Sequence, residues 1–227
     1  MRNSAGCDDR VSSGIRVFEE FYQQYDKWFR RNKWVYRSEV EAVRKLIPHE
    51  GFGLEVGVGT GRFSVPFGIE IGVDPSMRMG SIAMRRGIRV VCGVGEDLPF
   101  REEAFDFVLN ITTICFVEDP FTTLKETRRV LKNGGSVVIG FVDKKSKLGR
   151  LYETRKEKSR FYRAAKFVSV DDVLRWLMSL SFADFSAYQT IFHDLGEIDT
   201  MEPVKEGFGE GGFVALRAKK AVSETDR

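Results

Sequence analysis

Residues 54–61 read Leu54-Glu55-Val56-Gly57-Val58-Gly59-Thr60-Gly61, and this stretch decides how the rest of the chain is interpreted. A short apolar run that carries one carboxylate is followed by glycine at every second position. Glycine lacks a Cβ atom, so the backbone at Gly57, Gly59 and Gly61 can turn tightly and a ligand can lie directly against it. The stretch therefore predicts a strand that runs into a ligand-binding loop.

The spacing of these glycines argues against two phosphate-binding loops. The dinucleotide fingerprint G-x-G-x-x-G requires its third glycine at residue 62, where this chain has Arg62. The phosphate P-loop requires a lysine after its last glycine, and none follows Gly61. We therefore interpret the loop as a site for a nucleoside-like ligand without a pyrophosphate.

Four further motifs follow the glycine loop in order. They are Asp74-Pro75-Ser76 after the apolar run at residues 69–73, Glu96-Asp97-Leu98-Pro99-Phe100, Phe105-Asp106-Phe107-Val108-Leu109, and Arg129-Val130-Leu131-Lys132-Asn133-Gly134-Gly135. With these motifs the chain resembles the class I S-adenosylmethionine-dependent methyltransferases, in their small-molecule, methyltransferase type 11-like branch. The resemblance is strong over residues 52–143, weak from residue 169 onward and slight over the first 30 residues.

The pattern of strands and helices predicts the fold class. Apolar runs typical of strands alternate with stretches typical of helices, which indicates an α/β fold with a parallel sheet and helices on both faces. Open sheets of this kind bind ligands beyond the carboxyl ends of their strands, where the glycine loop is expected. The resemblance implies a Rossmann-like three-layer sandwich, with a mostly parallel seven-stranded sheet and an antiparallel last strand.

The chain is expected to form one domain, since 227 residues with 42% hydrophobic content are enough for one packed core. We divide it into five segments. They are a disordered or frayed N-terminus (1–14), N-terminal helices that cover the cofactor site (15–50), the cofactor-binding core (51–143), a basic cap insertion (144–168), and a C-terminal helix with the closing strands of the same domain (169–220).

The resemblance implies that S-adenosylmethionine binds at the glycine loop and leaves as S-adenosylhomocysteine. Gly57, Gly59 and Gly61 would contact the methionine portion of the cofactor, and Glu55 would help to hold its amino group. Asn110, at the end of the strand predicted at residues 105–111, would hold the same amino group.

The nucleoside portion is expected beside the second acidic motif. Asp74 has two acceptor oxygens, which suit the two hydroxyl groups of a ribose. Pro75 and Met77 would lie against the adenine face.

The chain departs from the family at the adenine contact. Related sequences commonly have an aspartate where this chain has Val94, and valine cannot accept a hydrogen bond from the adenine amino group. Either Glu96 substitutes for that aspartate, or the backbone at Gly95 and Glu96 reads the base alone.

Two regions supply candidates for contact with the methyl acceptor. Residues 144–166 hold ten Lys or Arg and two acids, a net charge of +8 on a chain whose total is +3, so the remainder carries −5. This concentration suggests an anionic acceptor, with Arg150 and Arg155 as candidate ligands, although a solvated charged helix is the alternative. In the N-terminal helix, Tyr22 and Tyr25 are candidates, and packing on the core is the alternative.

We therefore predict methyl transfer from S-adenosylmethionine to a nitrogen, oxygen or carbon atom of a small molecule, with no metal and with no catalytic residue assigned. The sulfonium is already an activated electrophile, so the enzyme mainly aligns the acceptor. Three alternatives stay open: a different enzyme class on the same cofactor fold, a non-catalytic S-adenosylmethionine-binding module, and an RNA methyltransferase that uses residues 144–166. Nucleic acid is disfavoured, because the remainder of the chain is acidic.

The composition also bears on compartment. No apolar run approaches the roughly 20 residues that a membrane helix needs, so no membrane partner is expected. The three cysteines, Cys7, Cys92 and Cys115, are odd in number and widely spaced, which predicts neither a disulfide framework nor a zinc site. A cytoplasmic location is the expectation that follows.

Overall fold

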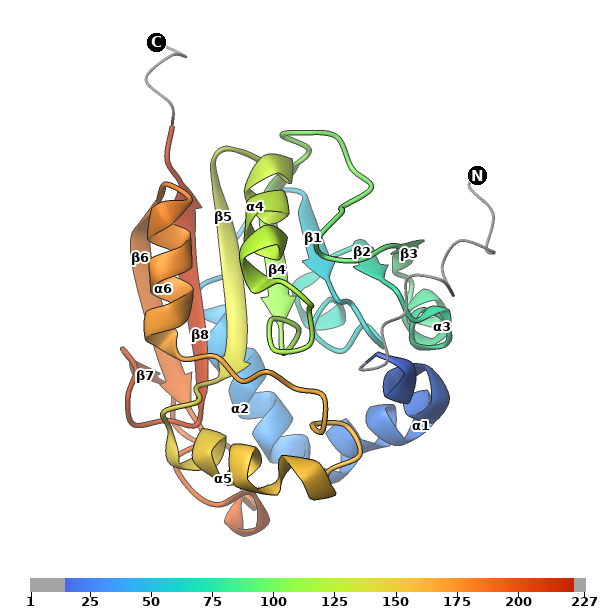
Figure 1. Ribbon diagram of the computed structural model, residues 1–227, viewed down its shortest axis with the longest axis vertical. Coiled ribbons are helices and arrows are strands. Elements are labelled where there is room, and N and C mark those ends of the chain that lie inside the picture. The colour runs from blue at the N-terminus through green and yellow to red at the C-terminus, as the bar shows by residue number, and fades with distance from the viewer. Residues whose placement is uncertain (1–14, 223–227) are drawn as a thin grey trace.

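A single eight-stranded sheet forms the centre of the protein in a computed structural model that describes residues 15–222 (Figure 1). Across the sheet the strands are ordered β3-β2-β1-β4-β5-β8-β6-β7. Their bounds are β1 Gly53–Val56, β2 Ile71–Asp74, β3 Arg89–Cys92, β4 Phe105–Ile111, β5 Leu131–Val142, β6 Phe182–Thr190, β7 Lys205–Glu206 and β8 Phe213–Lys220. The segment predicted at residues 1–14 lies outside the described residues.

The directions of the strands confirm the predicted fold class. Strands β1 to β5 pair in parallel, whereas β8 is antiparallel to both β5 and β6. The expected number of seven strands is one too low, because Lys205 and Glu206 pair antiparallel with Gln189 and Tyr188 and add β7 at the edge. Two residues are too few to leave a periodic pattern in the sequence, which is why this strand escaped prediction.

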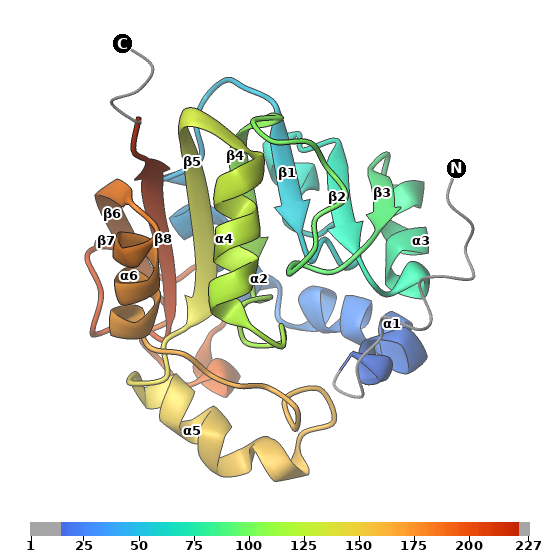
Figure 2. The same cartoon turned by 45° about the horizontal axis from the view of Figure 1, so that its top comes forward.

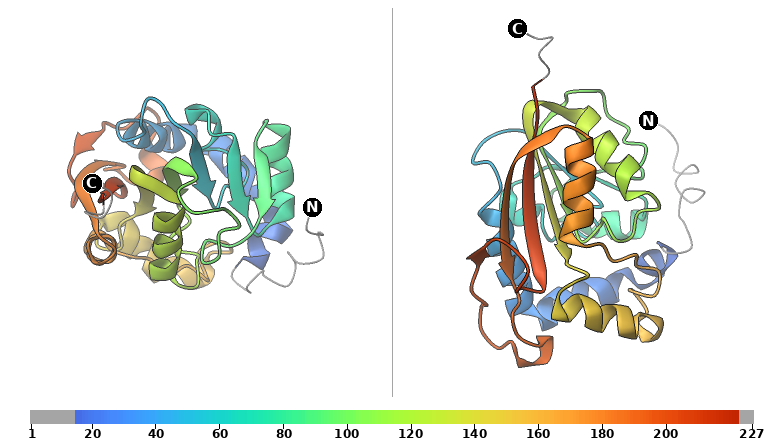
Figure 3. Two further views of the ribbon diagram at one scale, coloured as in Figure 1. Left: turned by 90° about the horizontal axis from the view of Figure 1, so that it is seen from above. Right: turned by 60° about the vertical axis from the view of Figure 1, so that its left-hand side comes forward.

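Helices cover both faces of the sheet. They are α1 Arg16–Arg31, α2 Lys33–Arg44, α3 Met77–Arg85, α4 Pro120–Val130, α5 Lys147–Arg155 and α6 Val170–Ser179, with short 3₁₀ turns at Val65–Phe67, Lys156–Lys158 and Leu195–Glu197. Helices α4 and α6 lie on one face and α2 lies on the other, as the views in Figures 1 and 3 show. This is the three-layer arrangement that alternating strands and helices predict.

The core is divided between the two faces by the alternation of side chains along each strand. In β5, Val137 and Ile139 belong to the apolar cluster that α4 and α6 complete, whereas Val138 belongs to the cluster on the side of α2. Val108 and Leu109 of β4 divide in the same way. Because apolar side chains bury both faces, the ends of the strands are left for binding.

Helices α1 and α5 lie at one end of the sheet. Figure 2 shows both of them beyond the end toward which the arrows of β1 and β2 point, which is the carboxyl end of the parallel strands. The segments predicted at residues 15–50 and 144–168 therefore meet at the end of the sheet where ligands are expected.

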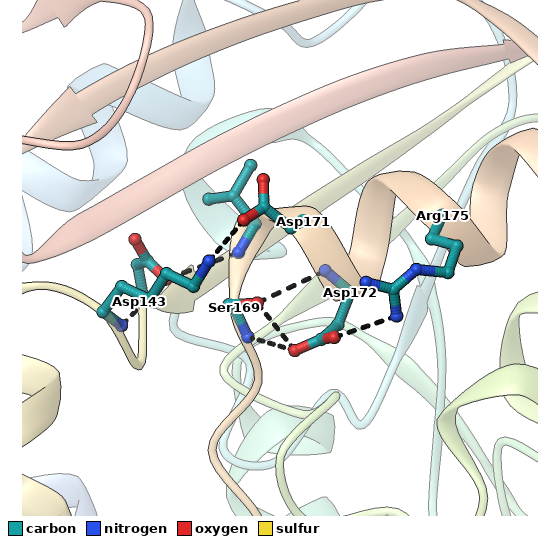
Figure 4. A network of polar contacts seen from close by, with 7 residues as sticks. Asp143, Ser169, Asp171, Asp172 and Arg175 are labelled. Carbon is teal, nitrogen blue, oxygen red and sulfur yellow. Dashed lines mark hydrogen bonds and ion pairs between the residues drawn. The ribbon is translucent and has the colours of Figure 1, made fainter.

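The cap segment, residues 144–168, is fixed at its base (Figure 4). One oxygen of Asp143, at the end of β5, accepts hydrogen bonds from the backbone N–H groups of Lys145 (3.2 Å) and Val170 (3.3 Å). Ser169 and Asp172 form a reciprocal capping box at the start of α6. Both ends of the cap are thus held against the core, so its position relative to the sheet is defined.

Three smaller observations concern the helices and the cysteines. Among the helices of residues 15–222, none has the length and apolar content that crossing a membrane would require. Cys115 is a buried free cysteine, and burial raises the pKa of its thiol to about 12. Cys92 is disulfide-bonded, which the number and spacing of the cysteines did not predict.

Candidate cofactor and acceptor site

A cavity of about 440 Å³ opens beyond the carboxyl ends of β1, β2 and β4. The elements that surround it are the glycine loop, the start of α3, the loop after β3, the loop after β4, and helix α1. The lining residues are Ile15, Phe18, Tyr25, Val56, Gly57, Gly59, Val73, Asp74, Pro75, Met79, Gly93, Val94, Gly95, Glu96, Ile111, Thr112, Thr113, Phe116, Val117 and Glu118. The position matches the site predicted from the glycine loop.

Gly59 leaves the space that a ligand would fill. Its φ is +52°, in the left-handed region that favours glycine. A Cβ atom there would lie 3.2 Å from Cε of Met79 and 4.0 Å from Cε1 of Tyr25, and both of these residues line the cavity. Any side chain at this position would therefore enter the cavity between them.

The other two loop glycines serve packing as well as turning. A Cβ atom on Gly57 would lie 2.2 Å from Oγ1 of Thr113, and one on Gly61 would lie 2.4 Å from Cδ1 of Ile88. Gly57 lines the cavity, but Gly61 does not. Gly61 instead lets the loop pack closely against the residue that precedes β3, so its predicted contact with the cofactor has no support from the cavity.

Asp74 is buried at the end of β2 and holds the glycine loop. One carboxylate oxygen accepts a hydrogen bond from the N–H of Gly59 (2.7 Å), and the other accepts one from the N–H of Ser76 (2.8 Å). Burial raises the pKa of Asp74 to about 6, although these two bonds oppose the rise. Each oxygen has a second lone pair, so Asp74 can accept further hydrogen bonds from a ligand in the cavity.

Glu55 and Asn110 lie behind the cavity wall. Neither lines the cavity, and their neighbours Val56 and Ile111 do, because successive side chains of a strand point to opposite faces. Glu55 is buried and accepts a hydrogen bond from the hydroxyl of Ser64, and burial raises its pKa to about 8. Asn110 is fully buried, and neither polar atom of its amide has a hydrogen-bond partner within residues 15–222.

The start of α3 contributes a different methionine from the one predicted. Ser76 caps this helix by accepting from the N–H of Met79. Met79 is buried and lines the cavity together with Pro75, whereas Met77 is only half-buried and lies outside the lining. The helical turn decides this, because it directs residues at 77 and 79 to different sides.

The loop after β3 contains the predicted adenine contacts. Val94, Gly95 and Glu96 all line the cavity. One oxygen of Glu96 accepts hydrogen bonds from the N–H groups of Glu118 (2.7 Å) and Asp119 (3.2 Å), so this carboxylate also holds the loop after β4. Its other oxygen forms no hydrogen bond within the described residues. That oxygen can therefore accept a hydrogen bond at the cavity wall, where the side chain of Val94 cannot.

Several lining residues were missed from the sequence. Thr112 has φ +53°, a strained value for a β-branched residue, directly after β4. The rings of Phe18 and Phe116, from α1 and the loop after β4, lie with their centroids 4.9 Å apart. Neither Phe18 nor Phe116 lies in a sequence pattern that indicates a binding site. They lie about 100 residues apart in the sequence, and the fold brings their rings together.

Helix α1 places one of its two candidate tyrosines in the cavity. Tyr25 lines it, and burial, with smaller effects from the charges of Asp74 and Glu55, raises the pKa of its hydroxyl. The hydroxyl is therefore protonated at neutral pH and can donate but not act as a base. Tyr22 is half-buried and lies outside the lining.

Two polar contacts fasten α1 over the site. Asp26 accepts hydrogen bonds from Arg62 (2.9 and 2.8 Å) and from Arg86 (2.9 Å), and these bonds lower its pKa although burial opposes them. Glu19, in the first turn of α1, accepts a hydrogen bond from the hydroxyl of Ser76. Arg62 stands where the dinucleotide fingerprint would have its third glycine. Its bonds to Asp26 connect the glycine loop to α1.

Five of the ten cations of the cap form ion pairs with acids at the surface. The ion pairs are Lys144–Glu153, Lys156–Glu153, Lys145–Asp171, Lys147–Asp194 and Arg163–Glu157. Arg150 and Arg155 are exposed and do not line the cavity. Lys166 contacts a lining residue, because its Nζ donates to the carbonyl oxygen of Glu118 (3.2 Å). The structure does not bring the two predicted arginines to the site.

Comparison with known proteins assigns the chain to a family. A family model described as a methyltransferase domain matches residues 54–139. The crystal structure of a "SAM-dependent methyltransferase, possible histamine N-methyltransferase" from Thermotoga maritima is similar with a TM-score of 0.88 and 49% sequence identity, covering 90% of this chain and 98% of that one. The chain belongs to the S-adenosylmethionine-dependent methyltransferases.

Relatives of this methyltransferase match most of its length. An uncharacterized protein of Methanocaldococcus jannaschii is 50% identical over 206 residues, which are 91% of this chain and 100% of the relative. A demethylmenaquinone methyltransferase of Oceanobacillus iheyensis is 28% identical over 240 residues, 96% of this chain and 93% of the relative.

S-adenosylmethionine is the cofactor of this methyltransferase, and the residues of the cavity fit it. Gly59 opens the space beside the loop, and Asp74 keeps acceptor capacity for hydroxyl groups. When bound, the cofactor supplies an activated methyl group. Which residue contacts which part of the cofactor stays a prediction.

Proposed function

We propose that this enzyme methylates a small molecule held between α1, the loop after β4 and the cap. The observation that carries the proposal is the composition of the cavity wall. Gly57, Gly59 and Asp74 form its polar side, and the rings of Phe18 and Phe116 form its apolar side. A small apolar acceptor suits the second side, because aromatic side chains bury large apolar areas and exclude water.

We further propose nitrogen as the accepting atom. The lining within residues 15–222 contains no histidine, lysine or arginine, and its one tyrosine, Tyr25, is protonated at neutral pH. A neutral amine carries its own lone pair and needs no base, whereas a hydroxyl group usually needs one. The Thermotoga relative is described as a possible histamine N-methyltransferase, which supports the same choice.

The anionic acceptor predicted from the cap has weaker support. Arg150 and Arg155 are exposed and outside the lining, and the charged lining residues are acids. If an anion were nevertheless recognised by the cap, Arg150→Gln or Arg155→Gln would raise the KM of the acceptor without changing cofactor affinity. We propose instead that both variants leave this KM unchanged.

Labelled methyl transfer tests the proposed function. Purified enzyme is incubated with methyl-labelled S-adenosylmethionine and with fractions of metabolites, RNA and protein, and Gly59→Val serves as the inactive control. Label is expected in amines of the metabolite fraction. Label confined to RNA would instead support the nucleic-acid alternative, and no label in any fraction would contradict methyl transfer to a small amine. A cytoplasmic location stays a proposal, which fractionation of the source cells tests.

A further inference from the structure

A buried carboxylate near the site has no partner. Glu39, on α2, is 7% exposed, and it forms no hydrogen bond or ion pair with any other residue between 15 and 222. Burial is the one cause that raises its pKa, to about 8, with no donor or cation to oppose it. An ionised carboxylate in such a place is unfavourable unless another group compensates its charge.

The other buried acids show how unusual this is. Glu55 accepts from Ser64, and Asp74 accepts from two backbone N–H groups. Asp26 is bonded to two arginines. Each of these acids is held by its own chain, and Glu39 is the exception among them. A buried polar group without a partner calls for an explanation, and a ligand is one.

The position of Glu39 on its helix connects it to the cavity. Val35 and Val43, one turn to either side on α2, belong to the apolar cluster on the α2 side of the sheet. Ile111 belongs to the same cluster, and Tyr25 packs against it. Both Ile111 and Tyr25 also line the cavity, so the layer that contains Glu39 borders the site.

Three tyrosines, from α1 and from the cap, interact electrostatically with Glu39, and we call Tyr25, Tyr152 and Tyr162 the tyrosine group. The negative charge of Glu39 contributes to the raised pKa of each of the three hydroxyls, as it does to that of Tyr36 on the same helix. The rings of Tyr152 and Tyr162 stack with centroids 4.6 Å apart. Phe161, from the same cap, meets Tyr25 at 5.9 Å.

We propose that Glu39 binds a cationic amine group of the methyl acceptor, separate from the neutral nitrogen that accepts the methyl group, next to the rings of the tyrosine group. A cation would form the ion pair that Glu39 lacks with residues 15–222, and aromatic ring faces attract cations as well. An anion at the same place would be repelled by Glu39. The inference rests on the proposed function and adds to it the residue that selects the acceptor by charge.

The proposal gives the cap a different role from the one predicted from its charge. Its aromatic residues, on α5 and the following loop, would close the acceptor site. Its cations Lys145, Lys147 and Arg163 instead pair with acidic side chains at the protein surface. The base of the cap is fixed to β5 and α6, so Tyr152 and Tyr162 have defined positions relative to Glu39.

The test compares Glu39→Gln with Glu41→Gln. Glutamine keeps the size of Glu39 and removes its charge, and Glu41 is a matched control because it lies on the same helix, exposed and paired with Arg44. The probes are histamine, 2-phenylethylamine and tryptamine, with 2-phenylethanol and 3-phenylpropanoate as neutral and anionic analogues. Binding of every probe is measured by calorimetry in the presence of S-adenosylhomocysteine. Methyl transfer is measured with labelled cofactor and histamine, which has ring nitrogens besides its cationic amine.

We expect at least one amine to bind the parent enzyme and Glu41→Gln, and to bind Glu39→Gln at least tenfold more weakly, since a charge-assisted hydrogen bond contributes roughly that much. The affinity for the alcohol should not differ between the variants. Equal amine affinity in Glu39→Gln and the parent, binding of the carboxylate alone, or no binding of any amine would each overturn the proposal.

The affinity for S-adenosylhomocysteine separates this inference from the proposed function. Glu39 does not line the cavity, so all three proteins should bind S-adenosylhomocysteine equally. Normal binding of S-adenosylhomocysteine together with an unchanged amine response would remove only the role of Glu39. Methylation of a phenol or of RNA by all three proteins would remove the proposed acceptor class as a whole.

Discussion

Replacing Asp74 by asparagine should weaken the binding of S-adenosylhomocysteine at least tenfold while changing the stability of the free protein little. The two effects differ because Asp74 has two tasks. In the free protein its carboxylate accepts from the N–H groups of Gly59 (2.7 Å) and Ser76 (2.8 Å). In the complex it is expected to accept from the ribose hydroxyls as well.

The magnitude for the free protein follows from the pKa. Burial raises the pKa of Asp74 from 3.8 to about 6, and one pKa unit corresponds to about 1.4 kcal/mol, so the ionised group lowers the free energy of unfolding by roughly 3 kcal/mol at pH 7. Asparagine removes this unfavourable term. It also turns one acceptor into a donor that faces a backbone N–H, at a cost of roughly 1–3 kcal/mol. The two changes nearly cancel, to within about 2 kcal/mol.

The magnitude for the complex has no such cancellation. One charge-assisted hydrogen bond contributes roughly 1.5–3 kcal/mol, which corresponds to a factor of about 10 to 100 in affinity. The sign with pH follows as well. Protonation of Asp74 removes acceptor capacity, so the affinity of the parent for S-adenosylhomocysteine should fall as the pH drops below about 6.

Calorimetric titration at pH 7 and pH 5.5 measures the affinity, and thermal and urea denaturation measure stability. Asp171→Asn is the control, because Asp171 is exposed, pairs with Lys145 and does not line the cavity. Unchanged affinity in Asp74→Asn would refute the assignment of this residue to the cofactor. Destabilisation of the free protein by more than about 4 kcal/mol would refute the cancellation.

Three further predictions concern the loop, the helix α1 and pH. Gly59→Ala and Gly68→Ala place alanine at similar positive φ values, but only the first Cβ atom would enter the cavity, so calorimetry should detect loss of S-adenosylhomocysteine binding in the first variant alone. Asp26→Asn removes the charge that holds Arg62 and Arg86 to α1, so S-adenosylhomocysteine should be released at least tenfold faster, as measured by a fluorescence chase. An unchanged rate would mean that α1 does not control release. Burial raises the pKa of Glu55 from 4.5 to about 8, so its contribution to the free energy of unfolding favours the folded state at low pH and is lost as the pH rises through 8. The midpoint temperature of thermal unfolding should therefore fall between pH 6.5 and pH 9. The fall should be smaller in Glu55→Gln.

Local sequence determined the elements that form the polar side of the site. The strand predicted at residues 105–111 has those same bounds, and Asp119 caps the helix that begins at Pro120. Glycines after an apolar run, and an acid after the next one, placed Gly59 and Asp74 at the cavity. These features depend on neighbouring residues, because strand periodicity, capping and turns are properties of a few consecutive positions.

Tertiary structure alone decided which side chains share that cavity and which acids have partners. Asp26 meets Arg86 across 60 residues, and the exposure of Arg150 follows from how the cap is fixed to the core. Glu39 reads in the sequence as an ordinary helical glutamate, since a surface and a buried position look alike over one turn. Whether a charge is solvated, paired or left without a partner depends on what packs around it, and residues distant in sequence supply those surroundings.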